Sequence, residues 1–123
     1  MGADPKSSIK KALGAWDSCF RPEMDRINMW CNDYRNVNEK RIKDQIAKDM
    51  QGVINGRLAS CTKKLTSDID SALSDFKSLP PELKKEMDGA AKYLKAYPGG
   101  KSCMKIDASV SGMTLTIKPS LKK

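Results

Sequence analysis

The side chains with the most distinctive chemistry in this 123-residue chain are four cysteines, which stand far apart at Cys19, Cys31, Cys61 and Cys103. No two of them are close enough to form the paired thiols of a zinc knuckle or a thioredoxin-like redox motif. An even number of scattered cysteines in a small, lysine-rich domain is typical of two disulfides formed outside the cytosol. We therefore expect a secreted, extracellular protein with two structural disulfides and no bound metal ion.

The chain contains no histidine, the side chain that most often serves as a general base near neutral pH. A serine nucleophile would therefore lack its usual partner, and no Gly-x-Ser-x-Gly motif is present. The sequence Gly-Gly-Lys-Ser at residues 99–102 is similar to the end of a phosphate-binding loop, but the earlier glycine and the preceding strand are missing. We expect a binding protein, not an enzyme, without a cofactor.

Lysine dominates the charged residues and gives the chain a formal net charge of +8 at pH 7. The excess is concentrated in residues 79–123, which carry nine Lys against four acidic residues. A basic surface of this kind attracts anions, including acidic protein patches and sulfated polysaccharides. The alternative interpretation is that the lysines only solvate the outer faces of helices. The candidates for a basic contact face are Lys63, Lys64, Lys84, Lys85, Lys92, Lys95, Lys101, Lys105 and Lys118.

Net charge alone does not indicate a nucleic-acid or membrane partner. Neither a recognition-helix arrangement nor a set of stacking aromatic residues accompanies the lysines. No stretch approaches the ~20 apolar residues that span a bilayer. Residues 1–5 look like a mature start behind an added initiator Met, as expected after removal of a secretion signal. We expect a monomer that binds other proteins.

Apolar residues recur at three-to-four-residue spacing over most of the chain, which indicates amphipathic helices. Proline is favoured at the first position of a helix, and Pro5, Pro22 and Pro81 each precede such a pattern. The sequence predicts helices near residues 5–19, 22–36, 39–77 and 80–97. The third would be unusually long for a small domain, so we expect a bend or break, at Gly52 and Gly56 or at an N-cap near Thr66.

The last part of the chain changes to the two-residue period of a strand. Apolar residues alternate from Met104 to Val110 and again from Met113 to Ile117. Residues 104–118 are therefore predicted to form a short hairpin or an extended arm laid on the helices. The expected fold is all-α, a disulfide-stabilised bundle of four to five helices with this C-terminal arm, in a single domain over residues 1–123.

Four cysteines allow three disulfide pairings, and their order in the sequence does not choose among them. A height estimate at about 1.5 Å per helical residue places Cys61 and Cys103 at similar levels on antiparallel helices. Cys19 and Cys31 would then form the second pair. A bend in the long third helix would change every one of these heights.

Tryptophan lies beside a cysteine in both early helices, at Trp16 and Trp30, and Tyr34 follows one turn later. Aromatic packing over a disulfide is the expected role of these residues. The alternative is that Trp30 or Tyr34 is exposed and anchors a partner protein, as Trp and Tyr often do in interfaces.

The chain as a whole resembles the anopheline mosquito salivary inhibitor family that includes albicin and anophensin. This chain resembles the family in being small, basic, rich in predicted helix and without histidine, and in having Asp-Pro-Lys-Ser-Ser at residues 4–8. The cysteine contexts that carry the resemblance are Trp-Asp-Ser-Cys at 16–19, Met-Trp-Cys-Asn at 29–32, Leu-Ala-Ser-Cys at 58–61 and Gly-Lys-Ser-Cys at 100–103.

The resemblance implies a non-enzymatic salivary protein that is injected into a vertebrate host during blood feeding. Members of the albicin type evade host immunity by binding the assembled convertase of the alternative complement pathway, whereas those of the anophensin type interfere with the kallikrein and kinin contact system. We expect the first activity. Contact-system inhibition and transport of a small ligand, as in insect odorant-binding proteins, are the alternatives. The family assigns no contact residues to this chain.

Overall fold

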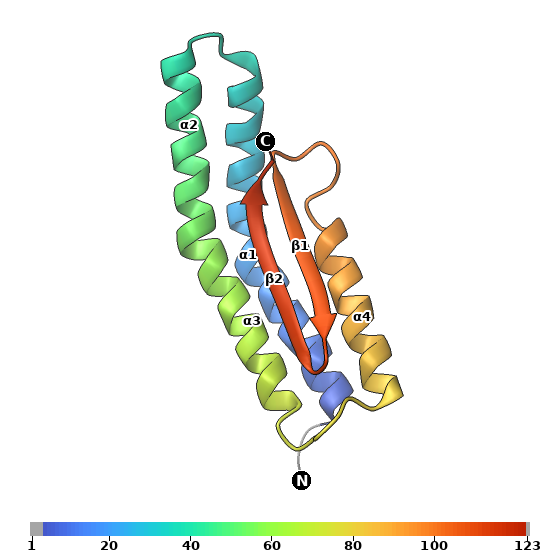
Figure 1. The fold of residues 1–123 in the computed structure, drawn as a ribbon. Helices are drawn as coiled ribbons and strands as arrows, with labels where there is room; N and C mark the ends of the chain where they lie inside the picture. Colours follow the sequence, from blue (N-terminus) through green and yellow to red (C-terminus); the bar gives the residue numbers. More distant parts are fainter. Residues whose placement is uncertain (1–3, 123) are drawn as a thin grey trace.

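Three long helical segments and one β-hairpin make up the computed structural model, which describes residues 4–122 (Figure 1). Helix α1 runs upward in Figure 1, the second segment runs down beside it, and α4 again runs parallel to α1. The hairpin lies lengthwise along the helices, with β1 next to α4 and β2 next to α3. The elements are α1 (Pro5–Asn36), α2 (Lys40–Val53), the π-helical turn η1 (Ile54–Leu58), α3 (Ala59–Ala72), α4 (Pro81–Ala96), β1 (Met104–Ser111) and β2 (Thr114–Leu121).

Helix α1 is continuous through Pro22, so the prediction of two helices over 5–19 and 22–36 is wrong. A proline inside a helix removes one hydrogen bond and costs about 3 kcal/mol. Pro22 and Ser18, whose carbonyl loses its partner, are both exposed, so water can replace that bond. The residues that α1 buries recur every three or four positions on both sides of Pro22, and each large one gains about 1.5–3 kcal/mol from burial. They are Ile9, Ala12, Trp16, Phe20, Met24, Ile27 and Cys31.

The second helical segment is α2, η1 and α3 joined end to end, as the long apolar stripe predicted, and the expected irregularity is η1. Met50, Ile54, Leu58 and Cys61 are all buried along it. A stripe that repeats every four residues drifts around an α-helix, and the wider i→i+5 turn returns it to the same side. The helix does not restart at Thr66, and it ends at Ala72, whereas 77 was predicted.

The C-terminal residues form the predicted hairpin, and it is a defined part of the core. Met104 pairs with Leu121 at one end of the antiparallel ladder and Ser111 with Thr114 at the other. Gly112 has φ +59° in the turn, a conformation that glycine adopts without strain. Together with the merged helices, this replaces the expected bundle of four to five helices by three helical segments and a two-stranded sheet.

Aromatic residues fill the centre of the core, where α1 faces α3 and α4. Trp16 is 2% exposed and stacks on Phe20, with 4.3 Å between ring centroids. The ring of Tyr97 meets Trp16 edge-on at 4.8 Å. The indole nitrogen of Trp16 lies 3.5 Å from the hydroxyl of buried Thr62, to which it donates a hydrogen bond. This cluster fixes the end of α4 against α1.

The disulfides join Cys19 to Cys61 and Cys31 to Cys103, so the pairing favoured from helix heights is wrong. The error follows from the continuous α1, because Cys19 and Cys31 lie on one helix, about 18 Å apart along its axis. A disulfide needs Cα atoms within about 7 Å. The observed pairs have Cα–Cα distances of 5.8 and 5.7 Å, and they attach α3 and the hairpin to α1.

Replacing one cysteine tests this pairing. Cys31→Ser is expected to leave a single reactive thiol, at Cys103, and to lower the free energy of unfolding by about 2–5 kcal/mol. Alkylation followed by peptide mass mapping locates the thiol, and denaturant titration measures the stability. The matched variant Cys19→Ser should expose Cys61 instead. Alkylation of Cys19 in the Cys31→Ser protein would contradict the structure.

Candidate functional site

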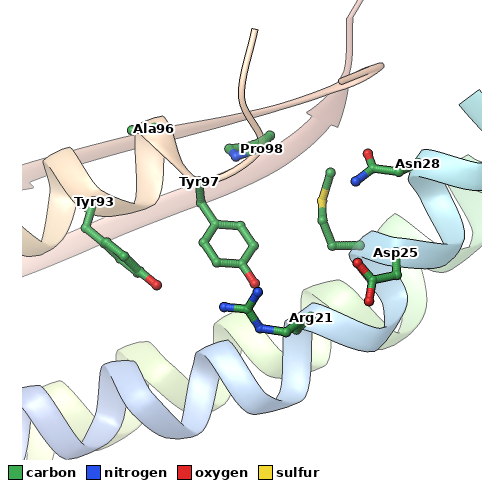
Figure 2. A pocket seen from close by; sticks show the side chains of 8 residues that line it. Arg21, Asp25, Asn28, Tyr93, Ala96, Tyr97 and Pro98 are labelled. Atoms are coloured by element: carbon green, nitrogen blue, oxygen red, sulfur yellow. The ribbon is translucent and has the colours of Figure 1, made fainter. Parts of the chain in front are cut away.

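A groove between α1 and the C-terminal end of α4 combines tyrosine, arginine and amide side chains on the protein surface (Figure 2). Its volume is about 390 Å³. We call it the tyrosine groove, lined by Arg21, Met24, Asp25, Asn28, Tyr93, Ala96, Tyr97 and Pro98. The spacing of four in both Asp17–Arg21 and Tyr93–Tyr97 places each pair on one helix face, and the packing of α1 against α4 brings the two pairs together.

Arg21 is held at the edge of the groove by an ion pair within α1. One terminal guanidinium nitrogen donates to both carboxylate oxygens of Asp17, at 2.9 Å each. Its guanidinium carbon lies 5.9 Å from the ring centroid of Tyr97, and Figure 2 shows the guanidinium group pointing toward the Tyr97 hydroxyl. The remaining guanidinium donors are available to a partner.

The two tyrosines have different roles in the groove. Tyr97 is half-buried, and its ring packs edge-on against both Trp16 and Phe20. Tyr93 is 45% exposed and meets Tyr97 at 5.9 Å between centroids. Tyr97 therefore fixes the wall of the groove, while Tyr93 presents a large aromatic surface to solvent.

The pKa values of these groups reflect their proximity. Burial, and then the Asp17 carboxylate, raise the pKa of Tyr97 well above its ordinary value of 10.0. The hydrogen bond from Arg21 is the main cause that lowers the pKa of Asp17 below its ordinary 3.8. Near neutral pH the groove therefore presents two neutral phenols and the Asp17–Arg21 ion pair, beside the acidic side chain of Asp25, a composition suited to binding.

The structure places the predicted aromatic anchors away from this groove, on the half of α1 that faces α2. Trp30 is half-buried, and the guanidinium carbon of Arg26 lies 5.9 Å from its ring centroid. Tyr34 is also half-buried, with the ammonium of Lys43 at 4.4 Å from its ring centroid. Both rings are partly covered by neighbouring cations, and their role as anchors stays a prediction.

The predicted basic residues are distributed over several surfaces. Lys84 and Lys64 pair with Asp88 and Asp68, at 3.0 and 2.9 Å, and Lys92 is exposed on α4. Other predicted lysines line three separate hollows. Lys85 lines a hollow between α1 and α4, and Lys63 and Lys118 line one between α3 and β2. Lys95 and Lys105 line a hollow beside the loop at residues 99–100, and Lys101 follows that loop in the sequence. The nine lysines therefore do not line one hollow, and their role as a basic contact face stays a prediction.

Arg21, Tyr93 and Tyr97 were not identified as candidate contacts from the sequence. The i,i+4 spacing was a usable signal that Asp17 and Arg21 share one helix face and that Tyr93 and Tyr97 share another. Their meeting across two helices depends on the continuous α1, which the Pro22 interpretation excluded.

Comparisons of this chain with protein-family models, with curated proteins and with solved structures find no match. Over the described residues 4–122, no helix is long and apolar enough to cross a membrane. The same part of the chain holds no group of three or more His, Cys, Asp or Glu side chains that could bind a metal ion. A binding surface is therefore inferred from the geometry of this chain.

The Asp17 carboxylate can be tested by its effect on Tyr97. Asp17→Asn is expected to lower the pKa of Tyr97 toward its ordinary value, because a negative charge that disfavours the phenolate is lost. The stability that Tyr97 contributes is present below pH 10 and disappears as the pH rises through its raised pKa. Ultraviolet titration of the tyrosinate band follows this ionisation, with Tyr93→Phe to assign it. An unchanged late-titrating tyrosine in Asp17→Asn would contradict the coupling.

Proposed function

We propose that this protein is a secreted inhibitor that acts by binding a protein target through the tyrosine groove, and that the target is the assembled convertase of the alternative complement pathway. The observation that carries the binding role is the exposed Tyr93 beside the ion-paired Arg21. Tyr and Arg, with Trp, are the residues most enriched at the energetic centres of protein interfaces.

Rigidity of the groove supports this role. Both walls are anchored, since Tyr97 packs on Trp16 and Phe20, and α1 is attached to other elements by two disulfides. A surface that is ordered before binding loses little conformational entropy when it docks, and this loss otherwise weakens association. The protein therefore suits inhibition by steric occupation of a large target.

The choice of target rests on the resemblance of the cysteine contexts and overall character to the salivary inhibitor family. An inhibitor of an assembled complex must prefer the assembly over its separate parts, which requires contact with both subunits or with a shape that only the assembly adopts. Residues on α1 and α4 together line the tyrosine groove, so a single docking surface spans two elements. When the convertase is bound at this groove, the inhibitor would cover the surface on which the convertase accepts its substrate.

The test is an alternative-pathway haemolysis assay run beside a contact-activation clotting assay. The unmodified protein is expected to inhibit haemolysis and to leave clotting unchanged. Inhibition of clotting alone would move the proposal to the contact system, and inhibition of neither would reject it. Displacement of a fluorescent fatty acid or dye is the corresponding assay for a small-ligand carrier.

Variants locate the contact within the protein. Tyr93→Ala, and separately Arg21→Ala, should weaken inhibition roughly tenfold to hundredfold, as expected for central interface residues. Ile42→Ala is the matched control, because Ile42 is also an exposed large side chain, 38% accessible, but lies on α2 outside the groove. Full inhibition by both groove variants, with intact folding by circular dichroism, would remove the groove from the mechanism.

A further inference from the structure

Basic side chains from three separate parts of the chain converge beside the loop that joins α4 to β1. Lys95 lies at the end of α4, Lys105 on β1, and Lys122 directly after β2. All three line one surface hollow of about 430 Å³, together with Gly99 and Gly100 of the loop, and no acidic residue lines it. Residues far apart in sequence thus create a local concentration of positive charge.

A second hollow continues this basic surface. Its volume is about 290 Å³, and Arg35 and Lys122 line it beside the Cys31–Cys103 disulfide. Lys122 belongs to both hollows, so the two adjoin at this residue. We call the combined surface of Arg35, Lys95, Lys105 and Lys122 the basic track. Its extended form suits a chain-like anion better than a single small ion.

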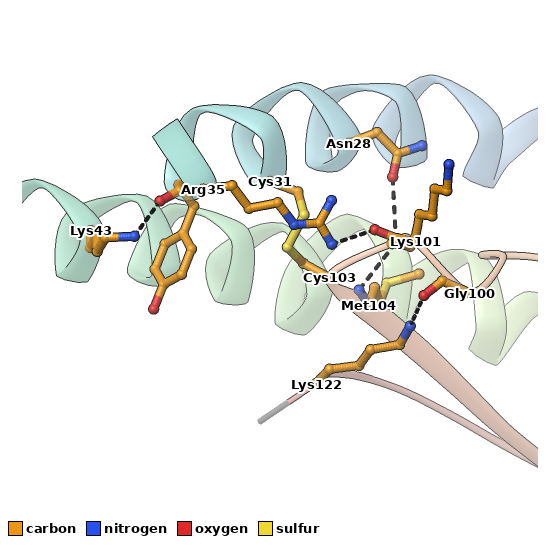
Figure 3. The surroundings of a disulfide bond; sticks show 11 residues. Asn28, Cys31, Arg35, Lys43, Gly100, Lys101, Cys103, Met104 and Lys122 are labelled. Atoms are coloured by element: carbon orange, nitrogen blue, oxygen red, sulfur yellow. Dashed lines mark hydrogen bonds between the residues drawn. A yellow bond between two sulfur atoms is a disulfide. The ribbon is translucent and has the colours of Figure 1, made fainter. Parts of the chain in front are cut away.

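Some of these cations also stabilise the loop (Figure 3). Arg35 donates a hydrogen bond to the carbonyl oxygen of Lys101, and the Lys122 ammonium donates to the carbonyl oxygen of Gly100 at 3.0 Å. A guanidinium has five donors and an ammonium three, so each retains donors for another acceptor. Within residues 4–122, no carboxylate lies within ion-pair distance of Lys95, and Lys105 has only the exposed Asp107 at 3.8 Å. The loop contacts therefore do not use up the positive charge.

We propose that the basic track binds a sulfated polysaccharide. Sulfate groups repeated along a flexible chain can contact the lysines of the first hollow and Arg35 of the second at once. The release of counterions from such a chain favours binding. The first hollow has no aromatic lining residue on which a nucleobase could stack, and the one aromatic residue that lines the second, Tyr34, already has the Lys43 ammonium 4.4 Å from its ring centroid. This disfavours single-stranded nucleic acid, which binds through a series of stacked bases. The track adjoins the tyrosine groove, because Ala96 and Pro98 line both the groove and the first hollow. A polysaccharide-bearing surface could thus hold the protein while the groove engages its target.

The binding test uses heparin as the probe and compares two charge-matched double variants. Lys95→Gln with Lys105→Gln removes two cations from the track and spares the two that hold the loop carbonyls. Lys10→Gln with Lys11→Gln removes the same charge from exposed positions near the start of α1. Each double variant lowers the formal net charge from +8 to +6. Circular dichroism melting verifies that both remain folded.

The unmodified protein should bind heparin at physiological salt, and the slope of log affinity against log salt should decrease by about two in the track variant. The α1 control should retain the original slope. Equal weakening in both variants would show an effect of net charge only and overturn the proposal. Absence of heparin binding, or tighter binding to anionic vesicles or single-stranded DNA than to heparin, would overturn it as well. Heparin binding is measured without the complement assay, so either proposal can fail alone.

Discussion

The continuous helix α1 is the constraint on which the rest of the structure depends. Its buried stripe passes Pro22 without interruption, and it supplies one cysteine to each disulfide. Cys19 fixes α3 and Cys31 fixes the hairpin, while the Trp16 and Phe20 rings receive Tyr97 from α4. The segment that contains α3, the hairpin and the end of α4 are thus each positioned against α1. The burial of many apolar groups on α1 outweighs the single hydrogen bond that proline removes.

Local periodicity predicted the helical content, the long second segment, α4 and the C-terminal hairpin, because burial on one face leaves a direct trace in the sequence. The π-helical turn also left a trace, the four-residue repeat from Met50 to Leu58. Two features were not predicted correctly from the sequence: the continuity of α1 through Pro22, and the disulfide pairing. Pro22 has the same local signature at a helix start and at an exposed interior position. The disulfide pairing was predicted from the estimated heights of Cys61 and Cys103, and the break assumed at Pro22 left Cys19 and Cys31 free to form the second pair.

The two candidate surfaces were predicted to different extents, because composition can be seen in a sequence and the meeting of distant residues cannot. The lysine excess of the C-terminal third is a property of composition, so its general location was visible in the sequence. The convergence of Lys95, Lys105 and Lys122 requires strand register and the path of the loop. The tyrosine groove requires the packing of α1 on α4. The groove and the basic track lie on either side of the end of α4, so the Tyr97–Phe20 contact orients both.

The pairing of the cysteines has a consequence for what happens when the backbone is cleaved. Cys19 bonds to Cys61 and Cys31 to Cys103, so the two covalent loops overlap between residues 31 and 61. Any single cleavage of the backbone between residues 19 and 103 therefore leaves both fragments attached through at least one sulfur–sulfur bond. Nicking in the exposed connection near residues 74–78, or in the 99–101 loop, would not release a piece of the molecule. If Cys19 had instead bonded to Cys31 and Cys61 to Cys103, residues 32–60 would lie outside both loops, and a single cut there would separate the molecule into two pieces.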